Sequence, residues 1–436
     1  MKKNNFFKST LILIFGTFIT RAMGFIIRIL YTRIIGTEGI SLYTLIMPTY
    51  SLIVTIAGFA MPITISKLVS VGKIRSKKIM AQSIYILLFI NIITMLIIIL
   101  ASDFISNYLL HEPRVKILLI GATLAMPNMA LACVLKGYFY GKQRMIPNTI
   151  SNIIEQTIRI LFIIFLLPYF VKKSVILGIL SFLLINILTE GASILTFIFL
   201  LPKNAKVSLT DIKFEKNLAH NIFSDSLPLV SGKLIGSFGF FLEPIILSNT
   251  LLLVGYDQSF FLKEYGIYNG YSLSLLMMPS FVIAALCTAI IPEISKHYSQ
   301  KNIKMVKLRI KQSLIVTLLF GIIVTVFIFM NRNYLLNLIY NTNEGSNYIA
   351  ALSIFFILYY LEAPLSAILQ ALNYSKFTMK TTTVGVFIKL MLMFILSFLH
   401  IGIYSLVIAE AINIFYIVYK NYYKIKRILK RYEYSK

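Results

Sequence analysis

The chain has 436 residues, of which 58% are apolar and only 13% are charged, whereas soluble domains carry about 25% charged residues. Lys and Arg outnumber Asp and Glu by 42 to 16, which gives a formal charge of +26. This charge does not indicate a nucleic-acid-binding protein, because apolar stretches of about 20 residues recur along the whole chain and leave no soluble domain to carry a basic patch. The composition therefore predicts an all-helical, multi-pass membrane protein.

The apolar stretches can be counted against the thickness of a bilayer. A hydrocarbon core of about 30 Å requires about 20 apolar residues in a helix, whose backbone polar groups are satisfied internally. On this basis the sequence predicts twelve transmembrane helices. Their expected ranges are 9–33, 40–67, 80–101, 117–139, 147–168, 175–200, 226–250, 267–294, 312–330, 347–372, 381–398 and 402–419.

The basic residues of the connecting loops are divided unequally between the two sides of the membrane. If the N-terminus is inside, the cytoplasmic segments hold 28 Lys and Arg residues and the opposite loops hold 6. Positively charged loops stay on the cytoplasmic side, and a miscounted helix would invert the pattern downstream. We therefore expect twelve spans in the cytoplasmic membrane, with both termini in the cytoplasm.

Two pairs of segments indicate an internal repeat. Residues 39–48 and 270–279 both read Gly-x-Ser-Leu-x-x-Leu-x-Met-Pro, and residues 135–145 and 369–379 share Leu, Tyr, Lys and Met at an offset of 234. An even number of spans in each half makes the repeat parallel. We expect two six-helix lobes, at 1–215 and 216–436, enclosing a central path as in an alternating-access transporter. The alternative is a duplication that only enlarges the bundle.

Prolines recur in both halves of this repeat. Proline removes a helix hydrogen bond and bends the backbone. One interpretation is a set of hinges that bend as a cavity opens, and the other is a set of static kinks filled by neighbouring side chains. The residues concerned are Pro48, Pro62, Pro279 and Pro292.

Two arginines lie deep in the first span. An ionisable group at mid-bilayer costs at least about 2.5–3.5 kcal/mol, so it normally faces the protein interior or water. Arg21 and Arg28 are seven residues apart and share one helix face, and no acidic residue lies on that span. Two such guanidinium groups suit an anionic, oxygen-rich ligand such as phosphate. The alternative is pairing with acidic residues of other helices.

Other basic residues also fall within spans. Lys233 is the expected counterpart of the two arginines in the second lobe, and Lys389 is either a further member of the cationic cavity or a partner of Glu362 or Glu410. Three basic residues near span ends can reach the membrane surface and are interpreted as anchors only. These are Arg33, Lys67 and Lys136.

The acidic residues of the spans allow two interpretations. Glu155 and Arg159 have the i, i+4 spacing of an ion pair, which would ease membrane insertion. Asp225 is expected to cap the start of the seventh span. The remaining carboxylates are candidates for binding a proton or a cation, or for charge pairing. These are Glu190, Glu243, Glu362 and Glu410.

Motifs of catalysis and cofactor binding are missing. The four histidines lie at or beyond span ends, and no zinc-protease motif, P-loop or serine-hydrolase motif occurs. Cys133 and Cys287 do not form a disulfide framework or a metal site. We expect no metal, no cofactor and no enzymatic activity, with energy supplied by an ion gradient or the membrane potential. A membrane-embedded transferase would need clustered acid and base residues at one membrane face, and the scattered histidines argue against such a cluster.

The N-terminal sequence also resembles a known family. The pattern Thr20-Arg21-Ala22-Met23-Gly24-Phe25-x-x-Arg28, continued by Arg33-Ile34-Ile35-Gly36-Thr37-Glu38-Gly39, is similar to the polysaccharide-exporter branch of the MOP (multidrug/oligosaccharidyl-lipid/polysaccharide) superfamily. It resembles in particular the stage V sporulation protein B group and the lipid II flippases. Leu42-Tyr43, Met47-Pro48 and the Tyr140-x-Lys142 loop resemble the same group.

This resemblance implies a V-shaped MATE-like fold and a flippase. The substrate would be an undecaprenyl-diphosphate-linked saccharide used in cell-wall, spore-cortex or polysaccharide synthesis, with Arg21 and Arg28 meeting the diphosphate. The partners would be this lipid-linked anionic oligosaccharide and membrane lipids, and the protein would be a monomer. Members of the group usually carry two further C-terminal helices linked to lipid-tail binding, in addition to the twelve spans that we count here. The assignment as a capsule or O-unit exporter therefore stays open. The principal alternative is a cation-coupled multidrug or small-molecule antiporter of the same superfamily.

Overall fold

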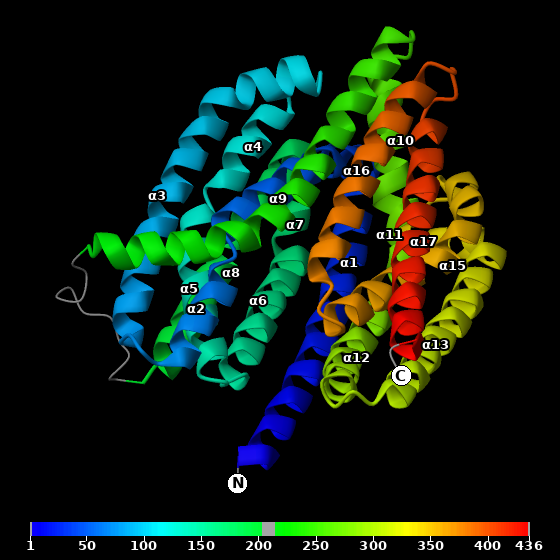
Figure 1. Ribbon diagram of the computed structural model, residues 1–436. Helices are drawn as coiled ribbons and strands as arrows, with labels where there is room; N and C mark the ends of the chain where they lie inside the picture. Colours follow the sequence, from blue (N-terminus) through cyan, green and yellow to red (C-terminus); the bar gives the residue numbers. More distant parts are fainter. Residues whose placement is uncertain (1, 203–213, 435–436) are drawn as a thin grey trace. The chain divides into compact units, whose positions relative to one another are not determined.

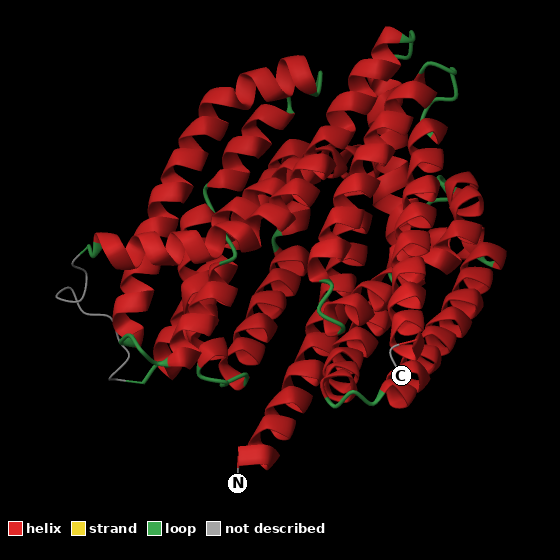
Figure 2. Cartoon of the chain, viewed as in Figure 1, coloured by secondary structure: helices red, strands yellow, loops and turns green. Residues whose placement is uncertain are grey.

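The computed structural model describes residues 2–202 and 214–434, nearly all of which are helical. In these two ranges no β-strand is present, as Figure 2 shows. Part of the basic loop that we count as cytoplasmic, residues 203–213, lies outside the described residues, as does Lys436. The predicted all-helical fold is confirmed.

Most helices of the first half are long, and the described connections between them are short (Figure 1). One element, η1, is a π-helix that continues α3. The elements are α1 (Lys2–Gly58), α2 (Met61–Val71), α3 (Ser76–Asp103), η1 (Phe104–Leu109), α4 (Val115–Thr123), α5 (Met126–Gly141), α6 (Ile146–Phe165), α7 (Leu167–Lys173), α8 (Val175–Leu200) and α9 (Lys216–Leu253).

The second half has the same character and a second π-helix, η4, which carries the start of the repeated Gly-x-Ser-Leu segment. The elements are α10 (Gln258–Gly266), η4 (Ile267–Ser272), α11 (Leu273–Met277), α12 (Ser280–Ser299), α13 (Ile303–Met330), α14 (Arg332–Tyr340), α15 (Ser346–Ala371), α16 (Ser375–Ser397) and α17 (Tyr404–Tyr434).

Each predicted span falls on one or more of these helices. Within the described ranges, nine helical segments are long and apolar enough to cross a membrane, or ten if the bent pair α6 and α7 is one span. One of them, Gly16–Val71, contains the second predicted span and most of the first. The twelfth predicted span lies in α17, which is not among the nine and carries Glu410 and a basic C-terminal part. The helices are thus consistent with twelve spans.

The first two spans are separated by a break inside α1. Gly36 has φ 72° and ψ −176°, a conformation that is essentially restricted to glycine. Helical backbone resumes directly after this residue, so two helices meet at a kink with no loop between them. The predicted boundary near residues 34–39 is therefore produced by a single glycine.

Large apolar side chains point outward from many helices. Leu100 is 82% exposed, Phe199 84% and Phe165 72%, and each lies near the end of an apolar helix. A soluble protein does not present such a surface to water, whereas lipid chains are as apolar as these side chains. The chain is therefore a multi-pass membrane protein.

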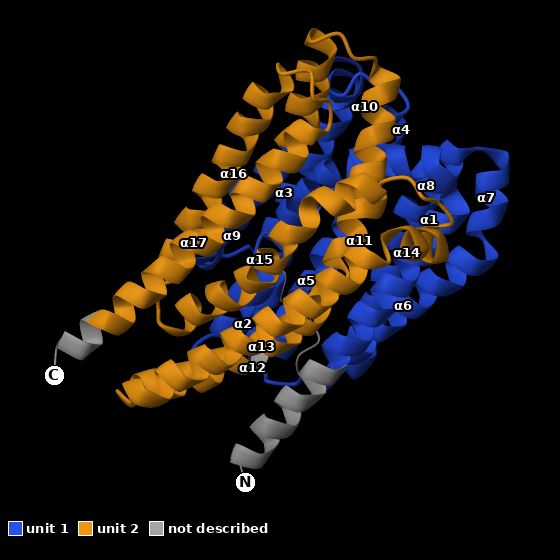
Figure 3. Ribbon diagram, turned by 90° about the vertical axis from the view of Figure 1, so that its right-hand side faces the viewer, with its two compact units in different colours: residues 1–241 blue, residues 242–436 orange. Residues whose placement is uncertain are grey.

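The chain divides into two compact units, Met1–Phe241 and Leu242–Lys436, shown in Figure 3. The division falls inside α9 and not at residue 215, where we place the boundary between the predicted lobes. The reason is that the first turns of α9 pack on α2 and α3: the Ser226 hydroxyl donates to Thr64 Oγ1 at 2.8 Å, and the Glu215 backbone N–H donates to Gln82. A boundary between moving lobes at residue 215 stays a prediction.

The four predicted hinge prolines occupy two kinds of position. Pro48 and Pro292 lie inside α1 and α12, which continue through them. Pro62 lies in the first turn of α2, and Pro279 lies directly before α12, so both follow a break between helices. Whether any of the four bends during function stays a prediction.

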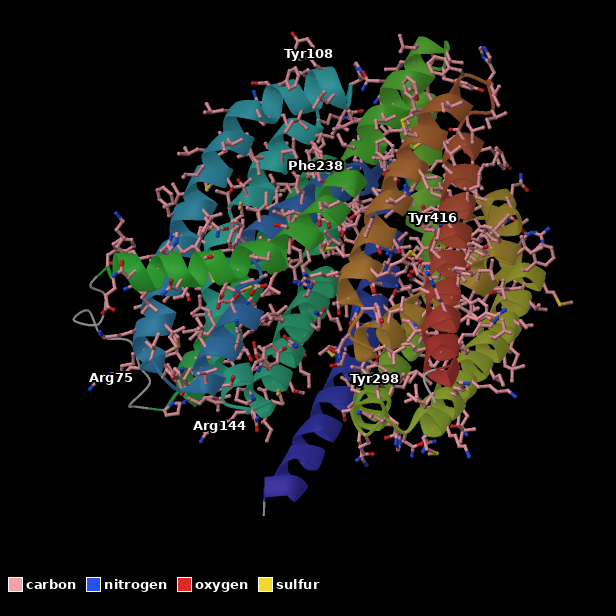
Figure 4. All side chains as sticks on the ribbon, in the orientation of Figure 1. Arg75, Tyr108, Arg144, Phe238, Tyr298 and Tyr416 are labelled. Carbon is pink, nitrogen blue, oxygen red and sulfur yellow. The ribbon has the colours of Figure 1, made fainter. Side chains whose placement is uncertain are left out.

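Three labelled residues show the two ends of the first unit. Arg75 and Arg144 lie at one end, and Tyr108 lies at the other (Figure 4). We assign the segments of both arginines to the cytoplasmic side from the loop charges, so this placement within the unit agrees with the predicted topology.

Candidate functional site

The two arginines of the first span lie on the part of α1 that precedes Gly36. Both side chains are exposed, and their separation of two turns places them on one helix face. Arg28 lies within electrostatic range of the Tyr43 hydroxyl, beyond the break in α1. Arg21 forms no ion pair with any described residue. The sequence has no acidic residue before Glu38, so this segment of the unit is strongly cationic.

Unit 1 also contains a largely buried network of charged and polar groups from three helices. Lys136 Nζ on α5 contacts Glu155 Oε1 on α6 at 3.1 Å. On α6, Arg159 Nη2 donates to Asn186 Oδ1 on α8 at 2.9 Å, and Thr189 Oγ1 lies 3.5 Å from the same nitrogen. These contacts hold the guanidinium in a fixed position between α6 and α8.

This network differs from the pairing that the sequence suggests. The i, i+4 pair of Glu155 and Arg159 is not among the ion pairs of the described residues, because Glu155 turns to Lys136 and Arg159 turns to the amide of Asn186. The interpretation of Lys136 as a simple anchor is wrong, since its side chain is only 21% exposed and neutralises a buried carboxylate. Helix spacing alone does not show which way each side chain turns.

Glu190 and Lys233 border the same network. Glu190 Oε2 on α8 is buried and has no hydrogen-bond partner in the described part of the chain. Lys233 on α9 is exposed and lies, with Lys136 and both glutamates, within electrostatic range of the Cys133 thiol. Because residues up to Phe241 belong to unit 1, Lys233 joins the basic residues of that unit and not those of the second.

Unit 2 contains a different buried cluster, formed by α9, α16 and α17. Lys389 Nζ lies 2.6 Å from Glu243 Oε2 and also contacts Glu410 Oε2. The Tyr265 hydroxyl donates to Glu243 Oε1 at 3.2 Å. The Glu243 side chain is 3% exposed, so a carboxylate in apolar surroundings is stabilised here by one ammonium and one phenol.

Further acidic character surrounds this cluster. Glu362 on α15 lies within electrostatic range of Glu410, and Tyr359 lies within range of both. The cluster thus contains three carboxyl groups and one ammonium group. If all four were ionised, the excess of two negative charges would be costly in apolar surroundings, so the site favours uptake of protons or other cations.

Lys389 has one of the two outcomes that the sequence leaves open. It pairs with Glu410, as one alternative proposes, and additionally with Glu243, whereas no ion pair with Glu362 occurs among the described residues. Its charge is fully engaged by two carboxylates. We therefore do not carry Lys389 into the cationic part of the site.

The internal repeat relates the two clusters. The offset of 234 that aligns residues 135–145 with 369–379 also places Glu155 opposite Lys389. Each residue forms an ion pair with a neighbouring helix of its own unit, but the sign of the charge is reversed. The duplicated position is thus used for charge pairing in both units.

One predicted cap is wrong. Asp225 does not cap a helix, because α9 begins nine residues earlier, at Lys216, and its carboxylate instead contacts Lys67 Nζ at 3.2 Å. Lys67 and Asp225 are 65% and 42% exposed, so this pair contributes little to stability.

Several polar members of the two networks are not identified by sequence reasoning. Asn186 and Thr189 on α8, and Tyr265 on α10, hold the charged groups but are common residue types in membrane helices. One signal exists: Asn186 and Glu190 are spaced i, i+4 in an otherwise apolar span, which places two polar groups on one face.

Comparison with known proteins agrees with this architecture. Residues 6–298 match the model of the family described as "Polysaccharide biosynthesis protein", and residues 269–395 match the MatE family model. Stage V sporulation protein B of Bacillus subtilis is 32% identical over 407 residues, which cover 91% of this chain and 79% of the relative. The lipid II flippase MurJ of Bacillus subtilis is 24% identical, over 88% of this chain and 76% of the relative.

Among solved structures, the chain resembles an inward-facing multidrug resistance MATE family transporter of the MOP superfamily. The TM-score is 0.78 at 13% identity, with 97% of this chain and 99% of that chain covered, which shows a common fold. The family match extends over more than half of the chain, and the similarity to stage V sporulation protein B covers most of both proteins. The chain therefore belongs to the polysaccharide biosynthesis protein family of MOP-superfamily transporters.

Proposed function

We propose that the protein is a flippase that moves an undecaprenyl-diphosphate-linked saccharide, such as a lipid II-like precursor, from the cytoplasmic to the outer leaflet of the cytoplasmic membrane. The saccharide would serve cell-wall, spore-cortex or polysaccharide synthesis. The proposal rests on one observation: Arg21 and Arg28 are exposed on an apolar helix segment that carries no acidic residue.

The chemistry of this surface suits a diphosphate. Guanidinium groups bind phosphate oxygens through paired hydrogen bonds, which an ammonium cannot do. Lys233 adds a third exposed basic group to unit 1. The buried charges of the same unit are engaged with each other or with an amide, Lys136 with Glu155 and Arg159 with Asn186, so their role is to position helices.

The direction of transport is proposed by analogy with flippases of the family, in combination with the predicted topology. Ion pairs near helix ends join residues that we assign to one side of the membrane: Lys78 with Glu215 on the inside, and Lys116 with Asp103 on the outside. Arg114 contacts Glu38 at 2.6 Å, and both belong to predicted outer segments. These contacts support the grouping of the loops into two sides. The loop charges are the basis for placing the termini in the cytoplasm, and we propose loading from the inner leaflet on that side.

The acidic cluster of unit 2 is the proposed coupling site. Glu243, Glu362 and Glu410 outnumber the single ammonium of Lys389, so a change in bound protons or cations alters the charge of this cluster. An internal repeat of this kind is typical of alternating-access transporters, and we propose that the protein acts as a monomer. The names of two relatives, stage V sporulation protein B and lipid II flippase, fit this assignment.

A transport assay tests the proposal. The protein is reconstituted in vesicles with fluorescent lipid II or with an unrelated polyprenyl-linked glycan, and outward movement is followed by quenching. We expect transport of at least one of these lipids, its loss in Arg21→Ala and Arg28→Ala, and partial activity in Arg21→Lys. Arg33→Ala, an exposed arginine of the same helix near the span end, is the matched control. Full transport by both alanine variants would contradict the proposed cationic site.

A second candidate is favoured by the carboxylate excess of unit 2. A cation-coupled multidrug antiporter binds cationic substrates to acidic groups, and the MatE match at residues 269–395 covers the region that contains Glu362 and Lys389. If neither lipid moves but a cationic dye is exchanged for H⁺ or Na⁺, and Glu362→Gln abolishes the exchange, the antiporter assignment is correct.

A further inference from the structure

Unit 2 contains an apolar groove between three of its helices. Its volume is about 340 Å³, within the range of ligand pockets. The lining residues come from α13, α15 and α17 and are all apolar or aromatic; they include Leu314 and Leu318, Leu361 and Leu365, and Phe415 and Tyr419. The groove therefore offers a ligand a predominantly apolar surface along its length.

The side of α17 that lines the groove is aromatic. The rings of Phe415 and Tyr419 lie nearly parallel, with centroids 6.1 Å apart, and those of Tyr419 and Tyr423 are 6.3 Å apart. All three side chains are more than half exposed. Such a row of ring faces suits contact with the double bonds and methyl groups of a branched, unsaturated chain.

One end of the groove is basic. On α13, Lys311 lies three residues before Leu314, and on α17, Lys426 lies four residues after Tyr422, so each lysine continues the stripe of its helix that lines the groove. The two helices run in opposite directions in both views, with the start of α13 and the end of α17 at the same end of the unit (Figures 1 and 3).

Both lysines are exposed, and neither forms an ion pair with a described residue. In the predicted topology this end of the unit is cytoplasmic. The groove thus combines an apolar channel with two positive charges at its inner-leaflet end, which is complementary to a lipid that carries a phosphate group on a hydrocarbon chain.

Lipid surroundings restrict what can make such a site selective. An apolar chain gains nothing from the hydrophobic effect when it moves from the bilayer into a groove, because lipid tails are equally apolar. Selection must come from packing, from the aromatic faces and from the two ammonium groups. A prenyl chain with a diphosphate satisfies all three conditions.

We propose that this groove is a docking position for the prenyl chain of the lipid-linked substrate, with the diphosphate held by Lys311 and Lys426. The inference rests on the proposed flippase function and adds a site in unit 2 to the cationic residues of unit 1. It assigns the recognition of the lipid chain to α13, α15 and α17.

Photolabelling tests the site directly. The full-length protein in vesicles is irradiated with a long-chain prenyl diphosphate that carries a diazirine in its chain, and the labelled peptides are mapped. We expect labels on α13, α15 and α17. Leu361→Trp, which fills the groove, should suppress labelling, whereas Leu319→Trp should not, because Leu319 is 55% exposed on α13 and does not line the groove.

The lysines are tested in the same assay. A lysine near an anionic group contributes about a five-fold gain in binding. The double variant Lys311→Gln, Lys426→Gln should therefore lose about 25-fold in labelling at low probe concentration. Lys73→Gln, an exposed lysine of unit 1, is the charge control and should keep full labelling.

Two outcomes would overturn the inference. One is labelling that Leu361→Trp leaves unchanged. The other is equal labelling by a phosphatidylglycerol with the same diazirine, which would mean that ordinary membrane lipid fills the groove. Flipping of fluorescent lipid II and of the unrelated polyprenyl-linked glycan by the wild type is measured in the same vesicles, and flipping of either lipid counts as transport. Flipping without groove labelling rejects the docking site and leaves the flippase function intact, whereas labelling without flipping rejects the flippase function.

Discussion

Unit 1 and unit 2 each hold a buried ion pair at the same position of the internal repeat, but they differ in how the charges around that pair balance. In unit 1, Lys136 and Glu155 neutralise each other, and the exposed cations include Arg21, Arg28 and Lys233. In unit 2, Lys389 is shared by two carboxylates, with Glu362 nearby.

We propose that this difference separates two tasks. A surplus of exposed arginines attracts an anionic group without holding the fold together. The buried carboxylates of unit 2 are tied to the fold, because Glu243 and Glu410 both depend on the single ammonium of Lys389. We therefore expect substitutions in unit 2 to reduce stability most, and substitutions of the exposed cations of unit 1 to reduce transport with little effect on stability.

The largest effect on stability is expected for Lys389→Met. Removing the ammonium leaves Glu243 and Glu410 buried without a positive partner, which should lower the free energy of unfolding by about 3–5 kcal/mol. Thermal unfolding in nanodiscs measures the change. Lys389→Arg keeps the charge and serves as the control; equal stability of wild type and Lys389→Met would mean that water reaches these carboxylates.

The corresponding change in unit 1 is expected to be smaller. Lys136→Met leaves one carboxylate, Glu155, without its partner at 3.1 Å, and should cost about 3 kcal/mol. The charge swap Lys136→Glu with Glu155→Lys should recover part of this loss. If the swap is no better than the single variant, the local surroundings and not the pair determine stability.

A substitution at the break in α1 should reduce the free energy of unfolding by less than the two changes above. Gly36→Ala forces a side chain into a conformation that only glycine adopts readily, so we expect a loss of about 1–3 kcal/mol. Gly24→Ala on the same helix is the matched control, because a Cβ there would contact nothing within 4 Å and alanine favours a helix. Equal effects of both variants in the unfolding assay would argue against a special conformation at Gly36.

An exposed pair near the outer end of unit 1 should matter little. Glu38→Gln removes the contact between Glu38 and Arg114. Because the Glu38 side chain is 62% exposed and that of Arg114 is 37% exposed, the loss should be no more than about 1 kcal/mol. Arg114 keeps its contact with the mostly buried Glu112, at 2.7 Å. High salt should reduce the effect further, and a loss that salt does not reduce would contradict this interpretation.

The smallest effect on stability is expected where the effect on transport is greatest. Arg21→Ala removes an exposed side chain without an ion-pair partner among the described residues, so stability should change by less than about 0.5 kcal/mol. Flipping of the lipid-linked substrate should nevertheless be lost. A stability loss comparable to that of Lys389→Met would remove the distinction between the two units.

The sequence by itself determined the fold class, the helical spans and the ionisable residues that lie within them. Span prediction works because hydropathy is a local property and lipid requires each helix to satisfy its own backbone. The same reasoning identifies charged groups within apolar spans, such as Glu155, Arg159, Glu243 and Lys389, and each of these lies in a buried network of the structure.

The partners of those groups were decided only by the tertiary structure. Glu155 pairs with Lys136 and not with Arg159, Asp225 pairs with Lys67 and not with a helix end, and Lys389 binds Glu243 from a distant helix. The position of the unit boundary inside α9 and the backbone break at Gly36 were likewise decided by the tertiary structure. The physical reason is that hydropathy fixes where a helix lies in the chain, whereas ion pairing depends on the rotation of each helix and on which helices become its neighbours.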